Sequence, residues 1–204
     1  SYDTTHDREY YALRNAAGLI DVSPLFKYEV FGKDATEFLS RVMVKDVSKL
    51  KVGQCAYLCW CDDYGKVLDD GTVFRLDDTH YRVAAAEPTY SWLVRQSRRF
   101  DVTIEDSSTR YGTLSLQGPT SRDVLKNASD ADLDNLRYFT LTKAKLDDVD
   151  VVISRTGYTG DLGYEVWVES DQAIKVWDAA TGQEIRTLSG HTAYVGCVVL
   201  SRNG

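Results

Sequence analysis

A glycine-rich stretch at residues 155–165 carries several side chains that could hold a polar ligand. Its sequence is Arg-Thr-Gly-Tyr-Thr-Gly-Asp-Leu-Gly-Tyr-Glu, in which Arg155, Tyr158, Asp161 and Glu165 supply charge and hydrogen-bonding groups. Glycine recurs at every third position, which suits a loop that needs positive φ or close approach of the backbone to a ligand. Apolar residues on both sides predict flanking strands. A glycine-rich hairpin and a ligand-binding loop both fit this pattern.

Two adjacent acids, Asp69 and Asp70, interrupt an otherwise apolar strand. Aspartate is a poor strand former, and neighbouring residues of a strand face opposite sides, so one of the two carboxylates should point inward. An inward carboxylate must be paired, hydrogen-bonded or functional. The alternative is a bulge around Gly71 with both acids in solvent.

The composition is that of a globular protein and argues against several classes of function. The chain has 204 residues and a net charge of −7, and it shows no cluster of lysine and arginine, so nucleic acid is not the expected partner. No apolar run approaches the roughly 18 residues of a membrane span, and the start lacks a signal-peptide core, so a cytoplasmic protein is expected. Thirteen tyrosines and four tryptophans suit a sheet-rich protein or a pocket for a flat ligand.

The cysteines do not predict a metal site. Cys55, Cys59 and Cys61 share one strand face, but their spacing is unlike that of a zinc site and no histidine is near in sequence. They are interpreted as buried thiols.

The hydrophobic periodicity predicts an α+β protein. Helices are expected over about 3–17, 34–42, after Pro88 and over 120–127, with a helical turn at 130–136. Strands are expected over 26–31, 54–61, 66–76, 81–86, 102–104, 113–117, 137–145 and 149–154. The first part of this order, β-α-β-β-β-α-β, is close to a ferredoxin-like split βαβ unit with one extra strand. The absence of a long linker predicts that two such units share one core.

Five segments of the chain, taken in order, form a family pattern. They are Leu-Ile-Asp-Val-Ser at 19–23, Val-Phe-Gly-Lys-Asp-Ala at 30–35, Gly-Lys-Val-Leu-Asp-Asp at 65–70, Leu-Gln-Gly-Pro at 116–119 and the glycine-rich stretch at 155–165. In these segments and their order the chain resembles the aminomethyltransferase family, whose type member is the T-protein of the glycine cleavage system. The resemblance covers about residues 1–180 and implies tetrahydrofolate as cofactor.

The resemblance implies a role for individual residues. Asp70 resembles the family's catalytic carboxylate, and Tyr57 a residue near the folate. Tyr158 resembles a pterin-site residue, and Glu165 the acid that hydrogen-bonds the pterin's amino group and ring nitrogen. Arg155 is added as a cofactor-binding candidate. The implied partner is a small-molecule one-carbon donor or a lipoyl carrier protein.

The chain also departs from the family. Ala85 stands where the family often has asparagine, and the chain stops at Gly204, before the family's arginine-bearing segment and C-terminal barrel. Residues 173–204 instead resemble a single WD-repeat, which cannot close a propeller alone. The expected organisation is therefore a folate-binding domain at 1–172 and a WD-repeat-like tail at 173–204. In the folate family residues 174–177 would be helical, whereas in a WD-repeat 174–177 and 184–188 would be strands.

Three functions follow from these observations. The first is a tetrahydrofolate-dependent aminomethyl- or methyltransferase. The second is a folate-binding protein without transfer activity. The third is a chimeric or truncated chain that acts as an interaction module through exposed strand edges.

Overall fold

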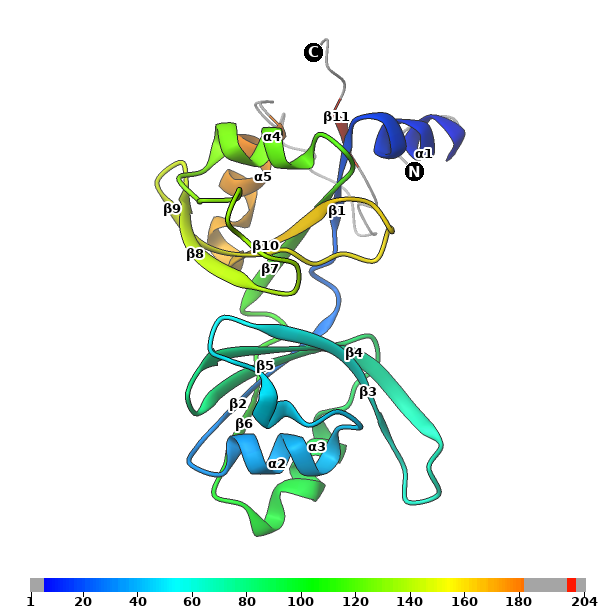
Figure 1. The fold of residues 1–204 in the computed structure, drawn as a ribbon, viewed down its shortest axis with the longest axis vertical. Coiled ribbons are helices and arrows are strands. Elements are labelled where there is room, and N and C mark those ends of the chain that lie inside the picture. Colours follow the sequence, from blue (N-terminus) through cyan, green and yellow to red (C-terminus); the bar gives the residue numbers. More distant parts are fainter. Residues whose placement is uncertain (1–5, 182–197, 201–204) are drawn as a thin grey trace. The chain divides into compact units, whose positions relative to one another are not determined.

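The computed structural model describes residues 6–181 and 198–200, and the chain divides into two compact units (Figure 1). Unit 1 comprises residues 1–23 and 110–204, and unit 2 comprises residues 24–109. The expectation of one shared core is wrong, because each unit has its own hydrophobic cluster. Unit 2 is inserted into unit 1, an arrangement that a search for linkers does not reveal.

Unit 2 is a five-stranded antiparallel sheet with two helices. The sheet order is β3-β4-β5-β2-β6. Its elements are β2 (Phe26–Phe31), α2 (Ala35–Val42), η1 (Val47–Lys49), β3 (Cys55–Cys61), β4 (Val67–Asp77), β5 (His80–Ala85), α3 (Tyr90–Gln96), η2 (Ser97–Arg99) and β6 (Thr103–Asp106). The predicted order β-α-β-β-β-α-β is confirmed for this unit. Its finer assignment to the ferredoxin-like class stays a prediction.

The core of unit 2 lies between one face of the sheet and both helices. Val30, Val73 and Val83 alternate toward this face, and Phe38 of α2 and Leu93 of α3 pack on them. Burying a side chain of this size stabilises the fold by roughly 1.5–3 kcal/mol. The opposite face carries polar residues such as Glu29, Asp70 and Arg82 beside a few apolar ones, so the two faces of the sheet have different roles.

Unit 1 is a six-stranded antiparallel sheet in the order β11-β1-β7-β10-β9-β8. Its elements are α1 (His6–Asn15), β1 (Ala17–Asp21), β7 (Tyr111–Gln117), α4 (Ser121–Ala128), β8 (Leu141–Leu146), β9 (Val149–Ser154), β10 (Gly163–Glu169), η3 (Ser170–Gln172), α5 (Ala173–Thr181) and β11 (Val198–Leu200). None of the helices in the described part of the chain is long and apolar enough to cross a membrane.

The first helix is shorter than expected at its end. α1 ends at Asn15, and Gly18 lies inside β1, opposite Gln117, because the central strand β7 offers β1 a pairing edge. In the segment expected to form a helical turn, at 130–136, residues 133–135 form a turn.

The segment from residue 173 adopts the helical alternative. Ala173, Val176 and Trp177 recur at helical spacing, and all three pack in the core cluster of unit 1. The strand that a WD-repeat requires at 174–177 is therefore not formed. Its second expected strand, at 184–188, lies outside the described residues.

Candidate functional site

The glycine-rich stretch forms the connection of a β-hairpin. Strands β9 and β10 are antiparallel, with Glu165 opposite Ser154. Gly160 has a φ of +80°, which favours glycine. Gly157 and Gly163 instead allow close packing, because a Cβ at either position would lie about 2 Å from the Gln117 side chain. Two of the three glycines thus serve a contact within the chain.

Gln117 belongs to a buried polar face that the sequence analysis missed. On β7, Leu114 and Leu116 point into the core, while Ser115 and Gln117 face the other way and are fully buried. Gln117 Nε2 donates to Ser115 Oγ at 2.9 Å and to the carbonyl oxygen of Thr156 at 3.2 Å, and Thr159 Oγ1 donates to Gln117 Oε1 at 3.0 Å. Alternation of leucine with polar residues predicts the two faces, but not that both are buried.

Glu165 lies on this polar face, in register with Ser115. Thr156 Oγ1 donates to Glu165 Oε2 at 2.6 Å, and Thr156 Oγ1 is also 2.7 Å from Ser154 Oγ. Burial raises the pKa of the Glu165 carboxyl, and the hydrogen bond from Thr156 opposes this only in part. Within the described residues, the second carboxylate oxygen accepts no hydrogen bond. Glu165 is therefore held by one oxygen and has acceptor capacity left.

The other candidate residues of the loop differ in whether their side chains already have partners within the chain. Arg155 donates from Nη1 to the carbonyl oxygen of Leu136 at 3.1 Å, which ties the loop to the segment before β8. Asp161 forms an ion pair with Arg14 of α1. Tyr158 is 70% exposed, so its ring is accessible to a ligand.

In unit 2, the two adjacent acids point to opposite faces, as the two-residue period predicts. Asp69 is the inward one. It is buried opposite Trp60, and its Oδ2 accepts a hydrogen bond from the backbone N–H of Glu87 at 3.0 Å. Asp70 lies opposite Cys59 and is half-buried on the polar face. The inward carboxylate is thus a structural acceptor, while Asp70 lies on the face away from the helices.

Tyr57 shares that face with Asp70. Tyr57 pairs with Thr72 and Asp70 with Cys59, so the two side chains are diagonal neighbours on one face of the β3–β4 pair. Tyr57 is 59% exposed. The structure brings these two predicted residues together.

The alternative of a bulge at Gly71 is wrong. Gly71 pairs regularly with Leu58 and Ala85, and the irregularity lies between Trp60 and Cys61. Gly71 is needed because the carbonyl oxygen of Ala84 would lie 2.1 Å from a Cβ there.

Two further expectations concern unit 2. Ala85 packs in the core cluster, whereas Ala84 pairs with Thr72 and shares the face of Asp70. Among the cysteines expected to be buried, Cys55 is buried, but Cys59 and Cys61 are only half-buried. The described residues contain no group of metal-ligating side chains.

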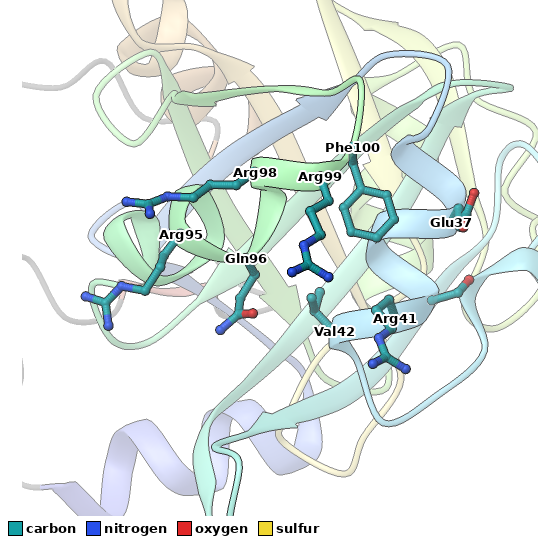
Figure 2. A pocket seen from close by; sticks show the side chains of 9 residues that line it. Glu37, Arg41, Val42, Arg95, Gln96, Arg98, Arg99 and Phe100 are labelled. Carbon is teal, nitrogen blue, oxygen red and sulfur yellow. The ribbon is translucent and has the colours of Figure 1, made fainter.

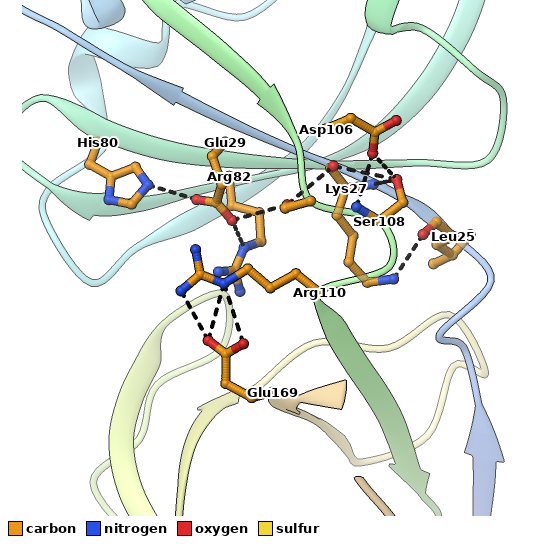
Figure 3. A network of polar contacts seen from close by, with 10 residues as sticks. Leu25, Lys27, Glu29, His80, Arg82, Asp106, Ser108, Arg110 and Glu169 are labelled. Atoms are coloured by element: carbon orange, nitrogen blue, oxygen red, sulfur yellow. Dashed lines mark hydrogen bonds and ion pairs between the residues drawn. The ribbon is translucent and has the colours of Figure 1, made fainter. Parts of the chain in front are cut away.

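On the polar face of unit 2, the glutamate Glu29 has partners at both of its carboxylate oxygens (Figure 3). Arg82 Nε donates to Glu29 Oε1 at 2.6 Å, and His80 Nε2 lies 2.6 Å from Oε2. Burial alone would raise the pKa of Glu29, but the hydrogen bonds and charges of His80 and Arg82 outweigh it and lower the pKa. No feature of the sequence singled out this residue, because its partners are distant along the chain.

Comparison with known proteins identifies related sequences. The family model described as the GCVT N-terminal domain matches residues 1–194. An aminomethyltransferase of Bacillus pumilus is 36% identical over 176 residues, which are 84% of this chain and 48% of the relative. An aminomethyltransferase of Halothermothrix orenii is 37% identical over 175 residues, which are 84% of this chain and 49% of that relative. The chain thus spans about half the length of the curated relatives it matches.

Solved structures show the same fold. The glycine cleavage system aminomethyltransferase T of Bartonella henselae superposes with a TM-score of 0.78 at 27% identity, over 86% of this chain and 48% of that chain. The heterotetrameric sarcosine oxidase of Corynebacterium sp. U-96 superposes with a TM-score of 0.60 at 18% identity, over 85% of this chain and 92% of that chain. At that identity the second similarity concerns the fold alone.

Proposed function

We propose, from the premise that the chain belongs to the GCVT N-terminal domain family, that it takes part in tetrahydrofolate-dependent transfer of an aminomethyl or methyl group. The observation that carries this proposal is the Glu165 carboxylate. It is oriented by Thr156, partly buried, and retains an oxygen that accepts no hydrogen bond within the described residues. A carboxylate in this state suits the paired N–H groups of an amino-pyrimidine ring.

The residues of unit 1 fit the pterin end of a folate. Glu165 would accept hydrogen bonds from the amino group and the ring nitrogen, and the exposed ring of Tyr158 would pack on the flat ligand. Arg155 would contribute positive charge while its bond to Leu136 holds the loop in shape. Tetrahydrofolate, when bound, supplies nitrogen atoms that accept the one-carbon unit.

Unit 2 carries the carboxylate that suits the chemistry of the transfer. We assign Asp70 the role of the catalytic carboxylate, which stabilises developing positive charge or moves a proton at the amine that is released. Tyr57, its diagonal neighbour, would contact the folate. The one-carbon donor is a small amine or a lipoyl carrier protein.

The test combines binding and turnover of the 204-residue chain. Isothermal titration with tetrahydrofolate should show saturable binding, and Asp70→Asn should lower transfer from an aminomethyl donor by about 10²–10⁴-fold with little change in folate affinity. Asp69→Asn is the matched control, because it removes the neighbouring charge from a structural position. Equal loss of turnover in both variants would refute the assignment of Asp70.

The competing function is folate binding without transfer. It predicts the same titration curve but no turnover with any amine donor offered, including one on a lipoyl carrier. A chain that does not bind tetrahydrofolate at millimolar concentration would contradict both functions.

A further inference from the structure

A cavity in unit 2 gathers positive charge that folate binding does not use. It has a volume of about 750 Å³ and lies between the end of α2 and the segment formed by α3 and η2. Four of its nine lining residues are arginines: Arg41, Arg95, Arg98 and Arg99. The sequence analysis found no cationic cluster, because Arg41 is more than fifty positions away from the other three.

Within the part of the chain that the structure describes, the side chains of these four arginines form no hydrogen bond, ion pair or ring contact. Several other arginines of the chain have such partners, for example Arg75, Arg82 and Arg122. All four are exposed, so their charges are available to a ligand from solvent.

The four guanidinium groups exceed what the helix ends require. Arg41 lies in the last turn of α2, and Arg95 in that of α3, where a cation interacts favourably with the negative helix end. Arg98 and Arg99 add two more charges on η2, at helical spacing from Arg95, and like charges at this spacing repel. A bound anion would offset this repulsion, which is modest between exposed side chains.

The shape of the cavity also suits a small ligand. In Figure 2, Arg99 extends from η2 toward the end of α2, where Val42 and Arg41 lie, and the half-buried Phe100 ring lies beside it. Arg95 and Arg98 extend to the other side, so a ligand that engages them together with Arg99 requires these exposed side chains to turn toward it. The volume falls in the range of small-molecule sites, which is about 300–1,000 Å³. With Glu37 as the single acid of the lining, the net charge is +3.

We propose that this cavity binds an oligophosphate group, meaning two or more linked phosphates as in pyrophosphate or a nucleoside diphosphate. The guanidinium fork matches phosphate oxygens in bidentate geometry, and several forks are satisfied only by a ligand with many acceptor oxygens. A net charge of +3 is offset by linked phosphates but not by one carboxylate. This site is independent of the folate proposal, because it uses none of the residues assigned there.

The test is isothermal titration of the 204-residue chain with sodium pyrophosphate at about 0.15 M salt, where distant charges are screened. We expect saturable binding with a Kd below about 1 mM. The double variant Arg95→Gln/Arg99→Gln should weaken it at least about tenfold, since each lost charged hydrogen bond is worth that factor. Arg137→Gln/Lys143→Gln is the matched control, because it also removes two positive charges, from exposed side chains of unit 1.

Several results would overturn the proposal. Absence of saturable heat up to about 10 mM pyrophosphate, a range that covers weak ligands, excludes the site. If the control Arg137→Gln/Lys143→Gln weakens pyrophosphate binding equally, the anion is attracted non-specifically to positive charge on the surface. Equal affinity for citrate shows that charge alone, and not phosphate geometry, decides binding. If the parent chain does not bind pyrophosphate and the double variant is less stable to heat, the arginines only stabilise the helix ends.

Discussion

Glu165 of unit 1 and Glu29 of unit 2 lie on interior strands of antiparallel sheets, yet their surroundings displace their pKa values in opposite directions. Both side chains are on the polar face of their sheet, away from the helices. Glu29 is enclosed by a guanidinium, an imidazole and the hydroxyl of Ser107, and its pKa is lowered. Glu165 has the hydroxyl of Thr156 for a partner, and its pKa is raised.

The difference separates a structural carboxylate from one that is available to a ligand. Glu29 Oε1 accepts hydrogen bonds from the Arg82 guanidinium and the Ser107 hydroxyl, and Oε2 lies against the His80 imidazole, so the charge of Glu29 is compensated within the fold. The charge of Glu165 is not compensated by any cation among the described residues, so a ligand that donates N–H groups would relieve it. A glutamate that the fold shields from water, fully or in part, therefore indicates a binding site only when the surrounding residues leave one of its oxygens without a partner.

The largest effect is expected from removing the partner of Glu29. Arg82→Met leaves a buried carboxylate beside an apolar side chain and should lower the free energy of unfolding by about 3–5 kcal/mol. Urea denaturation measures this. Arg110→Met is the control, since its ion pair with Glu169 is exposed and worth about 0–1 kcal/mol. Similar losses in the two variants would remove the distinction between the pairs.

Glu165→Gln should affect ligand binding and not stability. Tetrahydrofolate affinity should fall by about 10–100-fold, since hydrogen bonds to a charged group contribute roughly 1.5–3 kcal/mol. The free energy of unfolding at pH 7 should stay the same or rise, because a partly buried charge with no cationic partner among the described residues is removed. Glu169→Gln, at the exposed end of the same strand, is the control for titration and unfolding. Unchanged affinity in Glu165→Gln would make Glu165 a structural residue like Glu29.

Thr156→Val tests whether the hydroxyl positions Glu165. The substitution keeps the shape of a buried side chain and removes its bonds to Glu165 and Ser154, which should lower stability by about 1 kcal/mol. It should also raise the pKa of Glu165 further. As the pH is lowered, the carboxylate then becomes protonated earlier, and folate binding is lost at a higher pH than in the parent chain. Thr156→Ser should restore both properties, and a serine variant that behaves like valine would point to packing instead.

The smallest effect is a difference in pH dependence. The contribution of Glu29 to stability is present above its ordinary pKa of 4.5 and is lost as the pH falls through its lowered value. The contribution of Glu165 has the opposite sign: it is present below 4.5 and is lost as the pH rises through its raised value. The free energy of unfolding, measured from pH 3 to 8, should therefore depend less on pH below 4.5 in Glu29→Gln and less on pH above 4.5 in Glu165→Gln. If both variants lost their pH dependence over the same pH range, the opposite pKa shifts of Glu29 and Glu165 would be contradicted.

Local patterns were enough to predict several elements and one side-chain arrangement. The strands Phe26–Phe31 and Val149–Ser154 match their expected bounds, because alternation of apolar residues is a property of the segment itself. The opposite orientation of Asp69 and Asp70 follows from the same two-residue period. The family resemblance likewise depends on short segments in a fixed order.

Only the tertiary structure could decide which of these residues have partners within the fold and which are left for a ligand. Asp69 is the buried acid because the backbone of Glu87 reaches it, and Glu29 is neutralised by residues more than fifty positions away. The buried face of Gln117 and Ser115 depends on the pairing of β7 with β1 and β10, across an insertion of more than eighty residues. The sequence by itself determined which side chains could do chemistry. Long-range pairing determined which of them remain free to do it, because the desolvation and compensation of a charge depend on neighbours that only folding brings together.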